Sequence, residues 1–312
     1  MATRSSRSRV VARQLAWGVA VMWLVLTVTW VILHTLPDTR VVGFAEVEMG
    51  FAAAYDDPPG PLGLYLDWMR SFLTLQWGSS VYFGGSVVDL YVTRLPVTLA
   101  YALPGVVVSV LAGTGLSTYA AVHPDGVANR VLSLLSYAGL SIPAFLLAQG
   151  VFVVMPSWLG WIQIYDPELG LTHGQNLRRL SVPAAIVAVS FFAVQVRHAQ
   201  GETVEYLDAE FVKTARAKGA GRLRTAVHIF RNAWPSLASL VLGESLGLLI
   251  LMLIVIEELL KIKGVAVVVF YGFAAGDPMV SFTAVFGVVF VGVAGTLARD
   301  FARLVFDPRV DG

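Results

Sequence analysis

The sequence predicts an all-α membrane protein with six transmembrane helices. Hydrophobic residues make up 56% of the 312 residues and charged residues only 14%, and the mean hydropathy is +0.71. These values lie far from those of an ordinary soluble domain. A bilayer core needs roughly 20 apolar residues per helix. Six runs meet this requirement, with the fourth the shortest: 15–36, 95–121, 130–156, 181–196, 236–256 and 280–298.

The first apolar run follows four arginines, as a secretory signal would. It is longer than the apolar region of a signal peptide, and no small-residue cleavage site follows it before His34. A retained transmembrane helix is therefore the better interpretation.

The basic residues predict the orientation. If the N-terminus is cytoplasmic, the inside segments carry 15 Lys and Arg residues and the outside segments carry seven. We therefore expect a multi-pass protein of the cell (plasma) membrane with both termini in the cytoplasm. The expected layout is a cytoplasmic segment (1–14), a first helix (15–36), an extracytoplasmic loop (37–94), a five-helix core (95–306) with a cytoplasmic loop (197–235), and a cytoplasmic tail (307–312).

The first outside loop is too long to be a simple connector. Leu62, Leu66, Met69, Leu73 and Gln76 recur at helical spacing, which predicts a short amphipathic helix. Trp68 and Trp77 are expected at the lipid interface. A structural cap on the bundle and a contact with an external partner both remain open for this helix.

Prolines and glycines predict how the helices bend and pack. Pro104 and Pro143 fall inside apolar runs, where each removes a backbone hydrogen bond and can bend the helix. Pro96, Pro183 and Pro235 are expected near helix starts. Small residues of the second run, including Gly105 and Gly113, would permit close helix contacts.

A charged segment, residues 197–234, stands between two apolar runs and holds seven of the 22 Lys and Arg residues. Asp208 is predicted to cap a helix over Ala209–Lys218, about 15 Å long at 1.5 Å per residue, which Gly219 and Gly221 would end. A second helix, Leu223–Arg231, would follow. Phe211, Ala215 and Gly219 would share one face of the first helix, flanked by Lys213, Arg216 and Lys218.

The residues alone leave three roles open for this basic helix. It could bind anionic lipid head groups, serve as a solvated linker, or dock into a cytosolic motor.

The segment Glu210–Ser236 reads EFVKTARAKGAGRLRTAVHIFRNAWPS. It resembles the cytoplasmic signature of permease subunits in binding-protein-dependent ABC importers, in particular the dipeptide, oligopeptide and nickel branch. Thr214–Gly219 and Arg231–Ala233 carry most of the likeness. The sequence departs from the family in having Lys213-Thr214-Ala215 for Glu-Ala-Ala and Lys263 for a proline before Gly264. Further similar motifs are His34–Pro37, Trp77–Ser80, Arg94–Thr98, Leu140–Phe145, Glu257, Gly276–Pro278 and Asp307–Arg309.

The resemblance implies a type I ABC importer permease fold, in which the basic helix couples to cytosolic ATPases. The coupling residues would be Phe211, Ala215, Arg216, Lys218 and Gly219. Two ATPase subunits would bind ATP and magnesium, a related second permease would form a heterodimer with this chain, and an extracytoplasmic binding protein would deliver a peptide or a related solute. The residues themselves agree, because the sequence has no phosphate-binding P-loop and no internal repeat to supply a second half of the pathway. We therefore expect no enzyme activity and no cofactor in this chain.

Glu244 stands out within the fifth run, where a carboxylate is costly unless it faces a cavity or a partner. It could line the translocation path or hold helices together. The alternative function is a secondary transporter or channel without ATPases, which would need more buried ionisable residues. A membrane enzyme is disfavoured because Glu257 and Glu258 are too few acidic groups for a site. With no cysteine and five scattered histidines, no metal site is predicted, and we expect no nucleic-acid partner.

Overall fold

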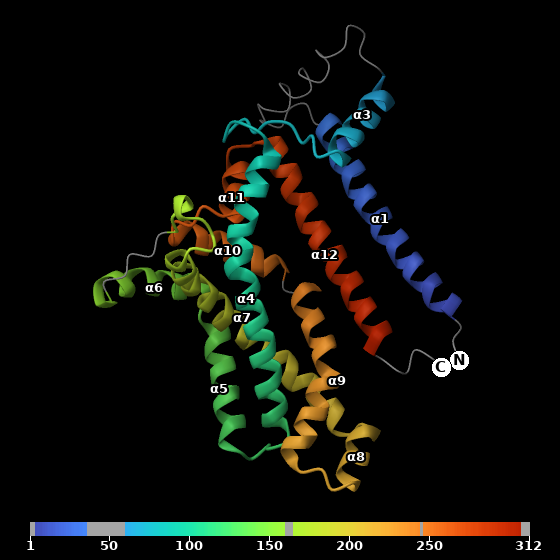
Figure 1. Cartoon of the computed structure of the whole chain (residues 1–312), viewed down its shortest axis with the longest axis vertical. Helices are drawn as coiled ribbons and strands as arrows, with labels where there is room; N and C mark the ends of the chain where they lie inside the picture. Colours follow the sequence, from blue (N-terminus) through green and yellow to red (C-terminus); the bar gives the residue numbers. More distant parts are fainter. Residues whose placement is uncertain (1–3, 36–59, 160–164, 244–245, 307–312) are drawn as a thin grey trace. The chain divides into compact units, whose positions relative to one another are not determined.

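The computed structural model describes residues 4–35, 60–159, 165–243 and 246–306. Within these ranges the chain is helical between short turns, and a single bridge between Ser79 and Ser86 is the only β pairing (Figure 1). The predicted all-α class is therefore confirmed. The chain divides into two compact units, with boundaries along the sequence between Val97 and Thr98 within α4, after Ile262, and after Leu297 within the last helix.

Unit 1 contains the outer-loop helix and the first and last long helices: α1 (Arg4–Thr35), α3 (Pro61–Leu73), the start of α4 (Val87–Ala121), α11 (Val265–Ala274) and α12 (Pro278–Phe306) as far as Leu297. Unit 2 contains the rest of α4, the end of α12 from Ala298, and the following elements: α5 (Val127–Ser141), α6 (Ala144–Leu159), the 3₁₀ turn η1 (Pro167–Leu169), α7 (Gly174–Leu207), α8 (Glu210–Ala217), α9 (Arg222–Gly243) and α10 (Leu246–Leu259).

Four described helices are long and apolar enough to cross a membrane: Val11–Ile32, Val87–Ala121, Gly174–Gly201 and Met279–Leu297. They correspond to the first, second, fourth and sixth predicted runs. The third run forms a bent pair, α5 and α6, which gives a fifth span if the pair counts as one. The fifth run is shared between α9 and α10, whose junction at 244–245 lies outside the described residues. The count of six spans therefore stays a prediction.

Pro143 breaks the third run as predicted. α5 ends at Ser141, and the following helix leaves at an angle of 90° (Figure 1). The prediction that Pro96, Pro183 and Pro235 lie near helix starts is wrong, because each falls well inside a helix. Neighbouring backbone in a helical bundle can tolerate the missing hydrogen bond.

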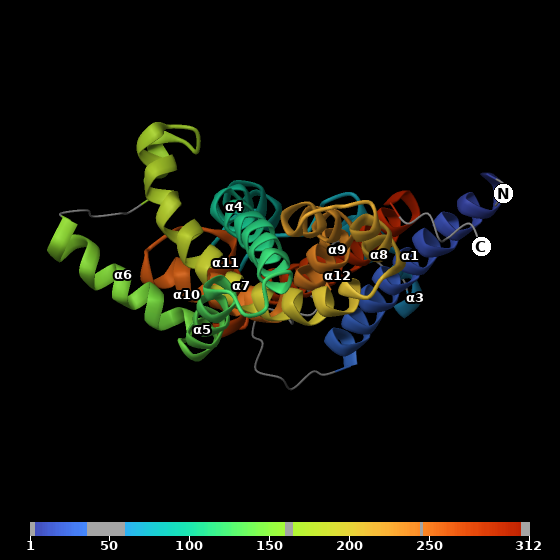
Figure 2. The same cartoon turned by 90° about the horizontal axis from the view of Figure 1, so that it is seen from below.

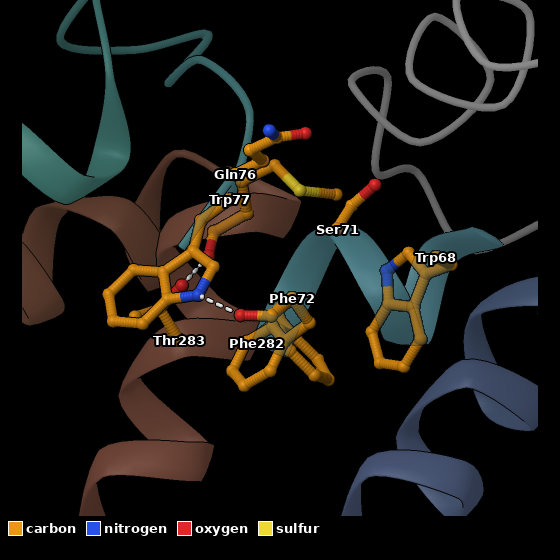
Figure 3. A pocket seen from close by; sticks show the side chains of 8 residues that line it. Trp68, Ser71, Phe72, Gln76, Trp77, Phe282 and Thr283 are labelled. Atoms are coloured by element: carbon orange, nitrogen blue, oxygen red, sulfur yellow. Dashed lines mark hydrogen bonds between the residues drawn. The ribbon is translucent and has the colours of Figure 1, made fainter. Parts of the chain in front are cut away.

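In unit 1, α3 forms where the amphipathic helix was predicted, but Leu62, Leu66 and Leu73 of the predicted face are exposed. Aromatic side chains instead anchor it to α12. The Phe72 ring lies 5.0 Å from Phe282 and 5.4 Å from Trp77, and the indole N–H of Trp77 donates to the carbonyl of Phe72 (Figure 3). Trp68 and Trp77, expected at the lipid interface, pack into this cluster. The small pocket that they line holds about 20 Å³, room for little more than one water molecule.

Also in unit 1, Asp277 joins two motifs that are almost 200 residues apart. Its buried carboxylate accepts hydrogen bonds from the Ser80 hydroxyl at 2.6 Å and from the backbone N–H groups of Tyr82 at 3.0 Å and Val280 at 3.1 Å. The bond to Val280 is an N-cap on α12, with Pro278 at the first helical position. The motifs Trp77–Ser80 and Gly276–Pro278 thus form one structural element.

In unit 2, glycines let α4 approach α7 closely. A Cβ on Gly105 would lie 2.7 Å from the Cβ of Val187, and one on Gly113 would lie 2.9 Å from the Cβ of Gln195. Atoms this close would clash, so a larger residue would push the two helices apart. The predicted packing role of Gly105 and Gly113 is confirmed.

Candidate functional site

The basic helix predicted from the sequence is α8, and its first residues set where it starts. The carbonyl of Ala209 accepts hydrogen bonds from the N–H groups of Val212 at 3.0 Å and Lys213 at 3.1 Å, so Ala209 is the N-cap residue. The prediction that Asp208 caps this helix is wrong. Because α7 continues to Leu207, Asp208 is instead the C-cap residue of α7, and its backbone is in the right-handed helical region.

The end of α8 is fixed by Gly219, as predicted. The N–H of Gly219 donates to the carbonyl of Arg216 at 2.9 Å, and that of Ala220 donates to Ala215 at 3.0 Å. These two bonds form a Schellman motif, in which the residue after the cap is left-handed. Gly219 has φ +81°, which a residue without Cβ adopts at low cost.

Val212 anchors α8 to the rest of unit 2. Its fully buried side chain belongs to a cluster with Val122, Ala199, Ala226 and Ile229. α8, the start of α9 and the α4–α5 turn lie at the same end of this unit, at the bottom of Figure 1 and facing the viewer in Figure 2. Val212 is not among the residues predicted from the sequence, although an apolar side chain in a short charged helix is a signal for a buried contact.

The predicted coupling residues differ in how far they are exposed. Arg216, Lys218 and Gly219 are exposed, and Ala215 is half-buried. Phe211 is also half-buried, because it packs against the Val212 cluster with its ring 6.2 Å from that of Tyr206. Phe211 is therefore only partly available to a partner.

The charges of this surface are mostly uncompensated. Lys213 and Glu210 form one long ion pair at 3.9 Å, and both side chains are largely exposed. Neither Arg216 nor Lys218 forms an ion pair within the part of the chain that the structure describes. Cations held on a fixed, exposed helix can pair with carboxylates of another protein.

The second predicted helix, Leu223–Arg231, is the start of a longer one. α9 runs from Arg222 to Gly243 without ending at Pro235. Arg222, Arg224, His228 and Arg231 are exposed on its first turns, next to α8. The basic surface therefore extends from α8 onto α9.

Glu244 lies outside the described residues. Near the end of α10, the acidic side chain of Glu257 is fully buried. Its Oε1 accepts hydrogen bonds from the Thr98 hydroxyl at 2.5 Å and the Tyr101 hydroxyl at 3.0 Å, both on α4. The motifs Arg94–Thr98 and Glu257 therefore meet as a link between α4 and α10.

The described residues contain no cluster of three or more His, Cys, Asp or Glu side chains that could hold a metal ion. The described structure thus combines apolar helices, buried hydrogen bonds of Asp277 and Glu257, and an exposed basic surface on α8 and α9.

Comparisons with known proteins agree with this arrangement. The chain is 28% identical to a putative peptide transport system permease protein of Brucella abortus, over 96% of this chain and 98% of the relative. It is 27% identical to the dipeptide transport system permease protein DppB of Bacillus subtilis, over 94% and 95% of the two chains, and 25% identical to the oligopeptide transport system permease protein AppB of the same organism, over 79% of each.

A family match covers most of the chain, including α8, α9 and every helix after them. Residues 113–312 match the family described as the inner membrane component of binding-protein-dependent transport systems. The resemblance inferred from the motifs is thus confirmed. This chain belongs to that family and is a multi-pass membrane permease subunit of an ABC importer.

Proposed function

We propose that this permease carries peptides and that α8 is the point where cytosolic ATPases drive it. The observation that carries the proposal is the basic surface of α8, which is exposed while its backbone is fixed at both ends by Val212 and Gly219. A rigid, charged element projecting from a membrane bundle suits a contact that must transmit force.

The peptide substrate rests on the names of the relatives, which include dipeptide and oligopeptide permeases. The similarity to the dipeptide permease extends over nearly the whole chain. Glu244 is proposed to line the path.

The partners follow from the same proposal. Two ATPase subunits bind ATP and magnesium, a related second permease completes the pathway as a heterodimer, and an extracytoplasmic binding protein supplies the peptide. The charge bias of 15 against seven Lys and Arg residues supports a plasma-membrane orientation with both termini in the cytoplasm.

The contacts of Val212 suggest how movement reaches the membrane helices. Val212 shares one buried cluster with Ala199 of α7, with Ala226 and Ile229 of α9, and with Val122, the residue that follows α4. When the ATPases close on ATP and displace α8, these three helices move with it, because packed side chains transmit a displacement without much compression.

The test is a tryptophan at Gly219, with a strain-matched control. Gly219 and Gly170 both have positive φ, +81° and +75°, and a Cβ on either meets nothing within 4 Å. Both substitutions therefore add the same bulk and similar backbone strain. Gly219→Trp is expected to abolish peptide uptake and co-purification with the ATPase subunits, whereas Gly170→Trp should retain the ATPases.

The contrary outcomes are specific. Normal uptake by Gly219→Trp, with the ATPases retained, would refute docking at α8. Uptake that continues with hydrolysis-deficient ATPases would instead favour a transporter working without a motor.

A further inference from the structure

The seam between α5 and α7 in unit 2 carries an ordered row of contacts. Gln200 donates to the Ser133 hydroxyl at 3.4 Å, and the guanidinium of Arg197 lies 5.1 Å from the centre of the Tyr137 ring. One turn further, a Cβ on Gly139 would lie 2.6 Å from that of Ala193. The residue numbers fall on α7 as they rise on α5, so the helices run antiparallel.

The seam opens into a pocket beyond the end of α5, beside Pro143. The pocket has a volume of about 340 Å³ and is lined mainly by apolar side chains of α5, α6, α7 and α10, including Leu140, Phe145, Val194 and Leu251. Ser190 lines it as well. Its hydroxyl oxygen is buried and has no hydrogen-bond partner in the described structure.

A cation lies along the same seam, beyond the pocket. Arg197 is exposed, follows the apolar run 181–196 directly, and forms no ion pair with any residue that the structure describes. Tyr137 beside it is 57% exposed. Arginine and tyrosine at the end of an apolar span lie at the depth of lipid head groups.

The spacing of these features matches an amphiphile. Arg197 and Ser190 are seven residues apart on α7, which is about 10 Å at 1.5 Å per residue. We propose that this seam binds one anionic phospholipid, with the phosphate at Arg197 and Tyr137 and one acyl chain in the pocket beside Ser190.

The lining favours a lipid over a transported peptide. Each peptide residue brings a backbone N–H and C=O, and burying them without partners is costly. The pocket lining offers few polar groups to satisfy them, whereas an acyl chain needs none. The uncompensated guanidinium complements a lipid phosphate.

The test measures lipids retained by the full chain purified with its partner subunits, by native mass spectrometry. The probes are mixed vesicles of palmitoyl-oleoyl phosphatidylglycerol and phosphatidylcholine, which share acyl chains. The wild type is expected to retain one phosphatidylglycerol in preference to phosphatidylcholine. Arg197→Gln should lower this occupancy at least tenfold, and Arg197→Lys should largely keep it because the charge remains.

Two further variants separate the pocket from general charge. Ser190→Phe fills the pocket, breaks no hydrogen bond of the described structure, and should displace the lipid with Arg197 intact. Arg70→Gln removes an exposed cation on α3 of unit 1 and should change nothing.

Equal retention of the two lipids, or unchanged retention in both Arg197→Gln and Ser190→Phe, overturns the proposal. Displacement of phosphatidylglycerol by a dipeptide, together with reduced uptake by Arg197→Gln, would assign the seam to the substrate instead. The measurement needs neither ATP nor transport, so its failure is distinguishable from failure of ATPase docking at α8.

Discussion

α8 and α11 end with the same backbone geometry in different surroundings. After α8, Gly219 has φ +81°, and the residues just before it include the exposed Arg216 and Lys218. After α11, Gly276 has φ +68°, and the next residue is Asp277, whose carboxylate is buried and accepts three hydrogen bonds. The same left-handed glycine therefore ends a helix beside exposed charges in one region and beside a buried, hydrogen-bonded carboxylate in the other.

The difference predicts what each region's charges do. Charges on α8 are free to meet a partner, so changing them should alter coupling with little effect on folding. The charge of Asp277 is fully used inside the chain, so changing it should destabilise the fold.

The largest effect is expected for Asp277→Ala. Three donors, from Ser80, Tyr82 and Val280, would lose their acceptor, and each unsatisfied group costs about 1–3 kcal/mol. We expect the free energy of unfolding to fall by roughly 3 kcal/mol or more, measured by thermal unfolding in detergent. Asp277→Asn keeps a carbonyl oxygen and should lose less. An unchanged melting temperature in both variants would show that this link is not structural.

Glu257→Leu should have the next largest effect. The hydroxyls of Thr98 and Tyr101 would stay buried without this acceptor, which costs about 2–4 kcal/mol for the two. Adding Thr98→Val and Tyr101→Phe removes both hydroxyls and should recover most of the loss in thermal stability. If the triple variant is no more stable than Glu257→Leu, the hydroxyls are not the cause.

Sequence patterns could predict α8 but not the surroundings of these carboxylates. The glycine stop and the basic residues of α8 are local signals within ten residues. Asp277 and Ser80 are 197 residues apart, and Glu257 and Thr98 are 159 apart, so no local pattern shows that they meet. The same limit explains the error at Asp208, because the continuation of α7 to Leu207 places Asp208 at the C-cap of α7. It also explains why the packing of Phe211 against the Val212 cluster could not be predicted from local spacing.

Val212→Ala tests how α8 is held, with a smaller expected effect. It removes two methylene equivalents from a buried site, roughly 2 kcal/mol including the cavity. Hydrogen exchange of α8 amides should rise on the order of tenfold or more, since 1.4 kcal/mol is a tenfold change. Val227→Ala on α9 is the control, because Val227 is 59% exposed. Equal exchange in the two variants would mean that Val212 does not anchor the helix.

The smallest effect concerns a third helix end. α10 also closes with a Schellman bond, from the N–H of Ile262 to the carbonyl of Glu257 at 2.9 Å, but the left-handed residue is Lys261, with φ +52°. Lys261→Gly should therefore raise the free energy of unfolding by about 0.5–1 kcal/mol, because glycine adopts this conformation without the cost of a Cβ.

Lys261→Ala distinguishes backbone strain from the loss of the side chain. Either substitution removes the exposed ion pair with Glu258 at 2.7 Å, which contributes little. Only glycine relieves the strained φ, so alanine should bring no gain in melting temperature. If both variants melt at the same temperature, the left-handed backbone costs nothing here, and the α10 end differs from those of α8 and α11 in sequence alone.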